Sequence, residues 1–93
     1  MDNKEKYSDN FIKKKLTTFI INKFLLGDVS STPGDDESFL ERGIIDSTGV
    51  LELVNFIEET FNITVEDEEL IPNNLDSLNK LTSYITKKIG HVS

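Results

Sequence analysis

The chain has 93 residues, enough for one domain, and contains no cysteine. A domain of this size buries only about two-thirds of the surface of its unfolded chain, which leaves little interior for a large ligand cavity. Without cysteine there are no disulfides and no thiolate metal sites, which favours a reducing compartment. No apolar run approaches the roughly 20 residues of a membrane span, and no signal-peptide pattern is present. We therefore expect a cytoplasmic protein whose functional site lies on its surface.

The net charge of −7 argues against nucleic-acid binding, which depends on Lys and Arg neutralising phosphates. The charge is unevenly distributed. Residues 28–76 contain fourteen acids and a single base, Arg42, whereas the segments on either side are net positive. An acidic central segment attracts basic partner surfaces, although its acids could also serve only to keep a small domain soluble. These acids lack the spacing of a calcium loop, so we expect no metal site.

The first predicted helix follows a flexible N-terminus at residues 1–8, begins near Asp9 and stops at Gly27. Its apolar residues recur at spacings of three and four, which is typical of a helix with one buried face. They are Ile12, Leu16, Phe19, Ile20 and Phe24. A long loop without helical period is predicted over residues 28–46. Loops this long are usually functional or anchored by their own side chains. The candidate anchors are Phe39, Leu40, Ile44 and Ile45.

The second helix is predicted from Asp46 or Ser47 to about Phe61, with Asn62 as its stop. Its inward-facing residues are Val50, Leu53, Val54, Ile57 and Phe61. An extended connector should follow at residues 63–65, because no second strand is available to pair with it.

A short helical turn is predicted at residues 66–70, ended by the sequence Pro-Asn-Asn at residues 72–74. The last helix should run from Asp76 or Ser77 to about Ile89. These elements predict an all-α fold: a small four-helix bundle of three main helices and one short helix, with a long loop between the first two. The domain is expected to span residues 9–89, with residues 90–93 as a C-terminal tail.

Ser47 lies where the long loop passes into the second helix. A catalytic serine needs a nearby base and a group that orients the base, but the single histidine is His91, close to the end of the chain. The adjacent carboxylates of Glu58 and Glu59 do not face each other on a helix and form no acid–base pair. An enzyme is therefore the least favoured class. Either Ser47 is modified by other proteins, or Asp46 and Ser47 are ordinary helix-capping residues.

Three motifs surround this position. They are SFLERGIIDS at residues 38–47, LVNFIEETF at residues 53–61, and LDSL at residues 75–78 followed by Tyr84-Ile85. Together with the order of the helices, they resemble the acyl carrier and peptidyl carrier protein family over about residues 9–89. The resemblance implies that Ser47 is esterified by 4′-phosphopantetheine from coenzyme A, whose thiol carries acyl or aminoacyl groups as thioesters.

The resemblance also implies the partners of a carrier that is not itself an enzyme. These are a phosphopantetheinyl transferase, an adenylating acyl or aminoacyl ligase and downstream transferases, which meet acidic and apolar side chains of the second helix. The matching residues are Asp46, Leu51, Glu52, Asn55, Glu58 and Glu59. We expect a monomer without membrane insertion. The alternative is a helical interaction module with a carrier-like fold and no prosthetic group.

Thr48 and Gly49 follow Ser47, whereas fatty-acid carriers typically have leucine and an acid at these positions. The Asp-Ser-Thr-Gly form is more similar to D-alanyl carrier proteins and to free-standing carriers with dedicated ligases. This resemblance favours a specialised biosynthetic pathway and gives an aminoacyl cargo a small preference over a fatty acyl cargo. We also expect the absent side chain of Gly49 to let an enzyme approach the phosphate closely.

Overall fold

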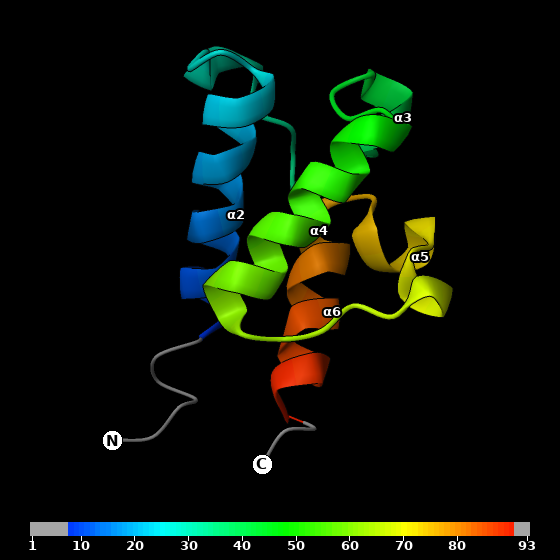
Figure 1. Ribbon diagram of the computed structural model, residues 1–93. Coiled ribbons are helices and arrows are strands. Elements are labelled where there is room, and N and C mark those ends of the chain that lie inside the picture. The colour runs from blue at the N-terminus through cyan, green and yellow to red at the C-terminus, as the bar shows by residue number, and fades with distance from the viewer. Residues whose placement is uncertain (1–7, 91–93) are drawn as a thin grey trace.

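A computed structural model describes residues 8–90 of the chain (Figure 1). Three long helices, α2, α4 and α6, are joined by shorter helical segments, and the described residues contain no strand, so the predicted all-α fold is confirmed. The elements in chain order are α2 (Asp9–Phe24), η1 (Val29–Ser31), α3 (Phe39–Arg42), α4 (Ser47–Phe61), η2 (Asp67–Glu69), α5 (Pro72–Leu75) and α6 (Leu78–Gly90). The predictions for residues 1–7 and 91–93, His91 among them, lie outside the described residues.

The core lies between the three long helices, each of which buries one stripe of apolar side chains. The fully or nearly fully buried residues are Ile12, Leu16 and Ile20 of α2, Leu53, Ile57 and Phe61 of α4, and Leu78, Leu81 and Ile85 of α6. Burying each such side chain stabilises the fold by about 1.5–3 kcal/mol. The predicted spacing is confirmed, although four of the predicted inward-facing residues are only partly buried, namely Phe19, Phe24, Val50 and Val54. The sequence pattern missed Phe56, which stacks on Phe19 between α4 and α2 with ring centroids 4.1 Å apart.

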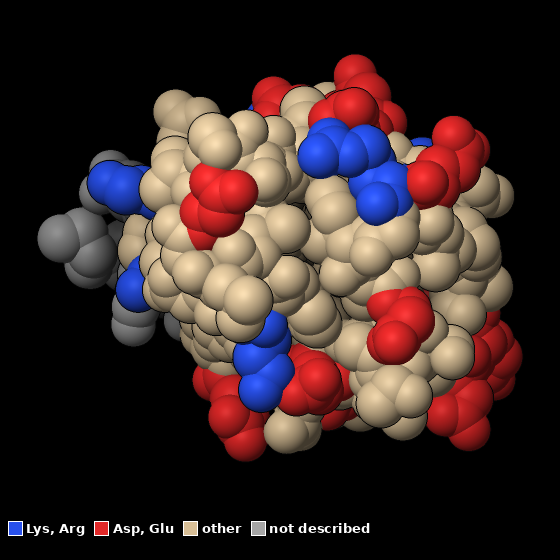
Figure 2. Space-filling view, turned by 90° about the horizontal axis from the view of Figure 1, so that it is seen from above, with Lys and Arg blue, Asp and Glu red and all other residues tan. Residues whose placement is uncertain are grey.

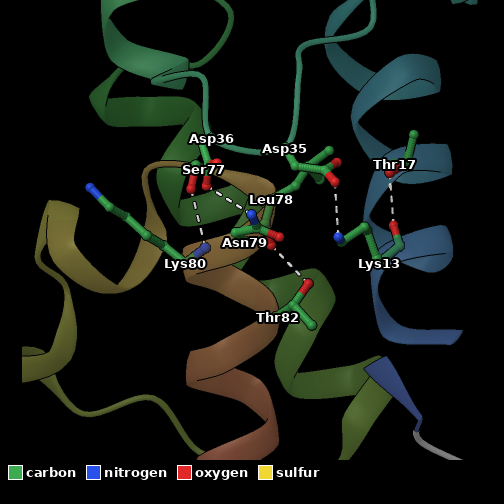
Figure 3. Close-up of polar contacts among 9 residues, drawn as sticks. All are labelled: Lys13, Thr17, Asp35, Asp36, Ser77, Leu78, Asn79, Lys80 and Thr82. Carbon is green, nitrogen blue, oxygen red and sulfur yellow. Dashed lines mark hydrogen bonds and ion pairs between the residues drawn. The ribbon is translucent and has the colours of Figure 1, made fainter. Parts of the chain in front are cut away.

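The loop between α2 and α4 is more structured than predicted, because it contains η1 and α3. Hydrogen bonds to the two neighbouring helices hold its middle part (Figure 3). The Lys13 ammonium lies 3.0 Å from an Asp35 carboxylate oxygen, and the Asn79 amide donates to Asp36 at 2.8 Å. Phe39 and Ile45 are buried anchors, as predicted, whereas Leu40 is half exposed. The long loop is therefore an ordered part of the fold.

The short helix lies later in the chain than predicted. Residues 66–70 form only the single 3-10 turn η2, and helix α5 begins at Pro72, the residue that we expected to end the helical turn. Proline suits the first position of a helix, because that position needs no N–H group and its φ angle is already helical. Asn62 ends α4 in the left-handed conformation, at a φ of 56°, as predicted.

Glu69 joins η2 to α6. One of its carboxylate oxygens accepts hydrogen bonds from the Glu66 N–H, the Tyr84 hydroxyl and the Lys88 ammonium, each at 2.9 Å. The Glu66 N–H and the Lys88 ammonium do most to lower the pKa of Glu69, which falls to about 2. The carboxylate is therefore ionised at physiological pH and keeps η2 bound to α6.

Asp76 connects α3 to the junction of α5 and α6. Its carboxylate accepts hydrogen bonds from the Ser38 hydroxyl and, at 3.0 Å, from the Leu40 N–H. Its backbone carbonyl accepts a third, from the Phe39 N–H at 2.9 Å. The Ser38 hydroxyl in turn caps α3 by accepting from the Glu41 N–H at 3.1 Å. One partly buried residue thus holds the segment that leads into α4.

Asp76→Ala is expected to lower the free energy of unfolding by about 2–3 kcal/mol, because the partly buried Ser38 hydroxyl and the more exposed Leu40 N–H both lose a charged acceptor. Urea denaturation measures this loss. Asp35→Ala is the matched control, since it removes another carboxylate that anchors the same loop. Its exposed ion pair with Lys13 is worth only about 0–1 kcal/mol. Equal losses in the two variants would show that Asp76 has no special role in fixing α3.

Candidate functional site at the start of helix α4

Asp46 caps helix α4. Its backbone is extended, at a φ of −98°, and its carboxylate accepts a hydrogen bond from the Gly49 N–H at 2.7 Å. Its carbonyl accepts the Val50 N–H at 3.0 Å. Side chains that cap a helix in this way bind N–H groups left unpaired in its first turn. Asp46 therefore accounts for the capping of this helix without help from its neighbour.

Ser47 is the first residue of α4, and it is exposed. Within residues 8–90 its hydroxyl has no hydrogen-bond partner. Capping thus explains Asp46 but leaves Ser47 unexplained. The start of a helix carries a partial positive charge and free N–H groups, an arrangement that favours a bound phosphate. An exposed hydroxyl in this place fits a phosphodiester linkage.

A shallow apolar pocket lies beside Ser47, between α4 and the segments α3 and α5. Its volume is about 300 Å³, and Ser47 forms part of its lining. Leu40, Leu51 and Ile71 lie at the pocket and are 50%, 61% and 43% exposed. The pocket can accommodate a small apolar group next to the serine.

Gly49 is buried, does not line this pocket and faces Phe24 of α2. A Cβ atom added to it would lie 2.9 Å from Cε1 of Phe24 and 3.1 Å from Cγ2 of Ile45. Contacts between carbon atoms this short are repulsive. The expectation that Gly49 opens access to a phosphate is therefore wrong. The glycine lets the Phe24 ring pack against the first turn of α4, a contact between helices that sequence spacing could not indicate.

The docking residues expected from the resemblance lie in different environments. Leu51, Glu52, Asn55 and Glu59 are exposed, as partner contacts require. The Glu52 carboxylate lies 2.8 Å from the Lys23 ammonium of α2, in an exposed ion pair. Glu58 is partly buried, and its carboxylate accepts the Val65 N–H at 2.9 Å. Glu58 thus has a structural function in holding the connector after α4.

The family model described as a phosphopantetheine attachment site matches residues 25–85. The chain is also similar to an acyl carrier protein of Akkermansia muciniphila, with 37% identity over 83 residues, or 89% of this chain and 99% of the relative. The protein belongs to the acyl carrier protein family. This chain is also similar to D-alanyl carrier proteins of Streptococcus suis and Streptococcus mutans. The identities are 35% and 34% over 68 residues, which cover 73% of this chain and 84% of each relative.

Membership of this family confirms three predictions. The fold is that of a carrier domain, the cofactor is 4′-phosphopantetheine, and the chain is a carrier rather than an enzyme. In the part of the chain that the structure describes, no helix is long and apolar enough to cross a membrane. The same residues include no group of three or more histidine and acidic side chains that could hold a metal ion.

Proposed function

We propose that this acyl carrier protein holds an acyl or aminoacyl group as a thioester on a 4′-phosphopantetheine arm attached to Ser47. The observation that supports this most strongly is that two adjacent residues differ in their hydrogen bonding. Asp46 caps α4 through the Gly49 N–H, and Ser47 presents an exposed hydroxyl without a partner among the described residues. Attachment at Ser47 would leave the capping hydrogen bond intact.

In the attachment reaction the Ser47 hydroxyl loses its proton and its oxygen forms a phosphodiester. The phosphoanhydride bond of coenzyme A breaks, and adenosine 3′,5′-bisphosphate leaves. Asp46 keeps the first turn of α4 in place, and the free N–H groups of that turn stabilise the negative charge beside Ser47. The bound group supplies a thiol for thioester formation, which a chain without cysteine does not have.

Two classes of cargo are each supported by a separate observation. The apolar pocket of about 300 Å³ next to Ser47 favours an acyl group with a hydrocarbon part. The Asp-Ser-Thr-Gly sequence and the names of the streptococcal relatives favour an aminoacyl group in a specialised pathway. The packing of Gly49 against Phe24 weakens the second argument, because it explains the glycine without reference to cargo.

We propose that the carrier acts as a cytoplasmic monomer, with a domain at residues 9–89, and that its partners contact α4. These partners are a phosphopantetheinyl transferase, an adenylating ligase and downstream transferases. Acidic side chains would bind basic groups on these enzymes and accelerate association, and an exposed apolar side chain would prolong the complex. The proposed contacts are Asp46, Leu51, Glu52, Asn55 and Glu59, with Glu58 contributing only charge because its carboxylate binds the Val65 N–H.

The test is to incubate the purified protein with coenzyme A and a broad-specificity phosphopantetheinyl transferase. We expect a mass gain of about 340 Da, the mass of one phosphopantetheine group joined through a phosphodiester. A helical interaction module with no prosthetic group would show no gain. A known carrier treated in parallel establishes that the transferase is active.

Glu52→Lys is expected to lower kcat/KM for this modification by about fivefold at low salt, because it reverses an exposed charge on the helix that begins at Ser47. Added salt should shrink the difference, since it screens exposed charges. The fold should lose little stability, because the ion pair with Lys23 is exposed. Glu68→Lys makes the same charge change on η2 and serves as control. Equal rates in both variants would contradict docking through Glu52.

A further inference from the structure

Two large apolar side chains project into solvent just after the end of α2. Leu26 is 92% exposed and Val29 is 69% exposed, more than any other large apolar residue that the structure describes. The segment that follows α2 lies at the same end of the molecule as α3 and the start of α4 (Figure 1). Seen from above in Figure 2, this end is mostly uncharged surface with scattered acidic and basic groups, some of them side by side. Both side chains are thus available to a partner that covers this end.

Leu26 also has an unusual backbone conformation for an exposed apolar residue. Its φ angle is 52°, in the left-handed region that glycine and asparagine adopt far more readily than leucine. The other described non-glycine residue in this region is Asn62, which fits the usual preference. The backbone conformation of Leu26 is therefore unfavourable for leucine, and burial of its side chain does not offset this cost, because the side chain is exposed. Strained residues of this kind concentrate at functional sites.

Hydrogen bonds hold this exposed loop in place. The Gly27 N–H donates to the Ile21 carbonyl at 2.9 Å. The Asp28 carboxylate accepts the Ser30 hydroxyl at 2.6 Å, the Ser31 hydroxyl at 2.8 Å and the Ser30 N–H at 3.1 Å. The two hydroxyl donors are the main reason why the pKa of Asp28 lies below its ordinary value. A preformed loop loses little conformational entropy when it binds a partner.

Phe24 joins this loop to the region around Ser47. It lies two residues before Leu26, and its ring packs against Gly49 in the first turn of α4. Figure 1 shows α2 on one side of α4 and α5 on the other. The exposed loop and the apolar pocket therefore flank the start of α4 on two sides. An enzyme that forms a bond to Ser47 itself must cover this region, whereas an enzyme that acts on the far end of a long arm need not.

We propose that Leu26 and Val29 form a second docking contact for the phosphopantetheinyl transferase, in addition to the contact with α4. The partner surface is an apolar recess with basic groups at its rim, because the exposed Asp28 lies between the two apolar residues in the chain and the exposed Asp46 caps the start of α4. The inference rests on the proposed function, since it assumes that Ser47 is the residue modified.

Three variants of Leu26 separate the apolar side chain from the backbone strain. Leu26→Gly and Leu26→Asn remove the apolar group and suit a positive φ, whereas Leu26→Met keeps an apolar group of similar size. With coenzyme A and a broad-specificity transferase, the first two should lower kcat/KM about tenfold, mainly through KM, as loss of an anchor residue does. Leu26→Met should stay close to the wild type. The melting temperatures of the Gly and Asn variants should equal or exceed that of the wild type.

Wild-type kinetics in Leu26→Gly would overturn the docking contact, and so would an equal loss in Leu26→Met. Because the Gly and Asn variants should be at least as stable as the parent, slower modification cannot be ascribed to unfolding. Val29→Thr adds a second probe, which keeps the shape of the side chain and should lower kcat/KM about threefold. If the wild-type protein itself gains no mass while a known carrier does, the proposed function fails instead of the docking contact.

Discussion

Ser47→Ala is expected to abolish the mass gain of about 340 Da that coenzyme A and a transferase produce. The variant should fold as well as the parent, because the Ser47 side chain is exposed and has no hydrogen-bond partner among the described residues. Alanine also favours helices, so the free energy of unfolding should change by less than about 0.5 kcal/mol. Intact-mass spectrometry and urea denaturation of the same preparation check both parts.

Thr48→Ala is the matched control. Thr48 carries the neighbouring hydroxyl in the first turn of α4 and is also exposed. It should keep the full mass gain, because its hydroxyl is not the proposed site. Retention of the gain in Ser47→Ala, or its loss in Thr48→Ala, would assign the arm to another residue.

Gly49→Glu is expected to lower the free energy of unfolding by about 3 kcal/mol or more, because overpacking and burial of a carboxylate add together. The new Cβ would lie 2.9 Å from the Phe24 ring and 3.3 Å from the Asp46 carboxylate. The added charge would therefore enter a buried position beside another acid. An acid is typical of fatty-acid carriers at this position, yet the contact with Phe24 makes it incompatible with this one. Urea denaturation gives the measurement.

Gly49→Ala separates the steric cost from the cost of the charge. We expect a smaller loss of about 1–2 kcal/mol, because the higher helix propensity of alanine offsets part of the cost of steric overlap. Phe24→Leu should recover part of this loss in a double-mutant cycle, with a coupling energy of about 1 kcal/mol. A Gly49→Glu variant as stable as the parent would show that close packing against Phe24 is not what requires the glycine.

The long helices could be predicted because their apolar residues repeat with the helical period. The buried faces of α2, α4 and α6 follow this repeat, and Asn62 ends α4 because asparagine tolerates a left-handed backbone. Helix α5 could not be placed in the same way. Pro72 is compatible both with the end of one helix and with the start of the next, and only the fold shows that it begins α5.

The candidate site was predicted in part. The position of Ser47 at the start of α4 follows from capping preferences, but its proposed modification comes from the resemblance to carrier proteins. The functions of Gly49 and Glu58 depend on Phe24 and Val65, neighbours that spacing along a helix does not reveal. The strained backbone of Leu26 could not be predicted either, because an apolar residue after a helix does not indicate a positive φ angle.

The intact mass of the protein purified from its own cell, with fragmentation to locate any added group, tests the carrier function most directly. We predict a mass above that of the bare chain by about 340 Da plus the mass of the cargo, with the addition on the fragment that contains Ser47. The extra mass would also distinguish an aminoacyl from an acyl group. A protein found only at the mass of the bare chain, or with its arm on another residue, would contradict the proposed function.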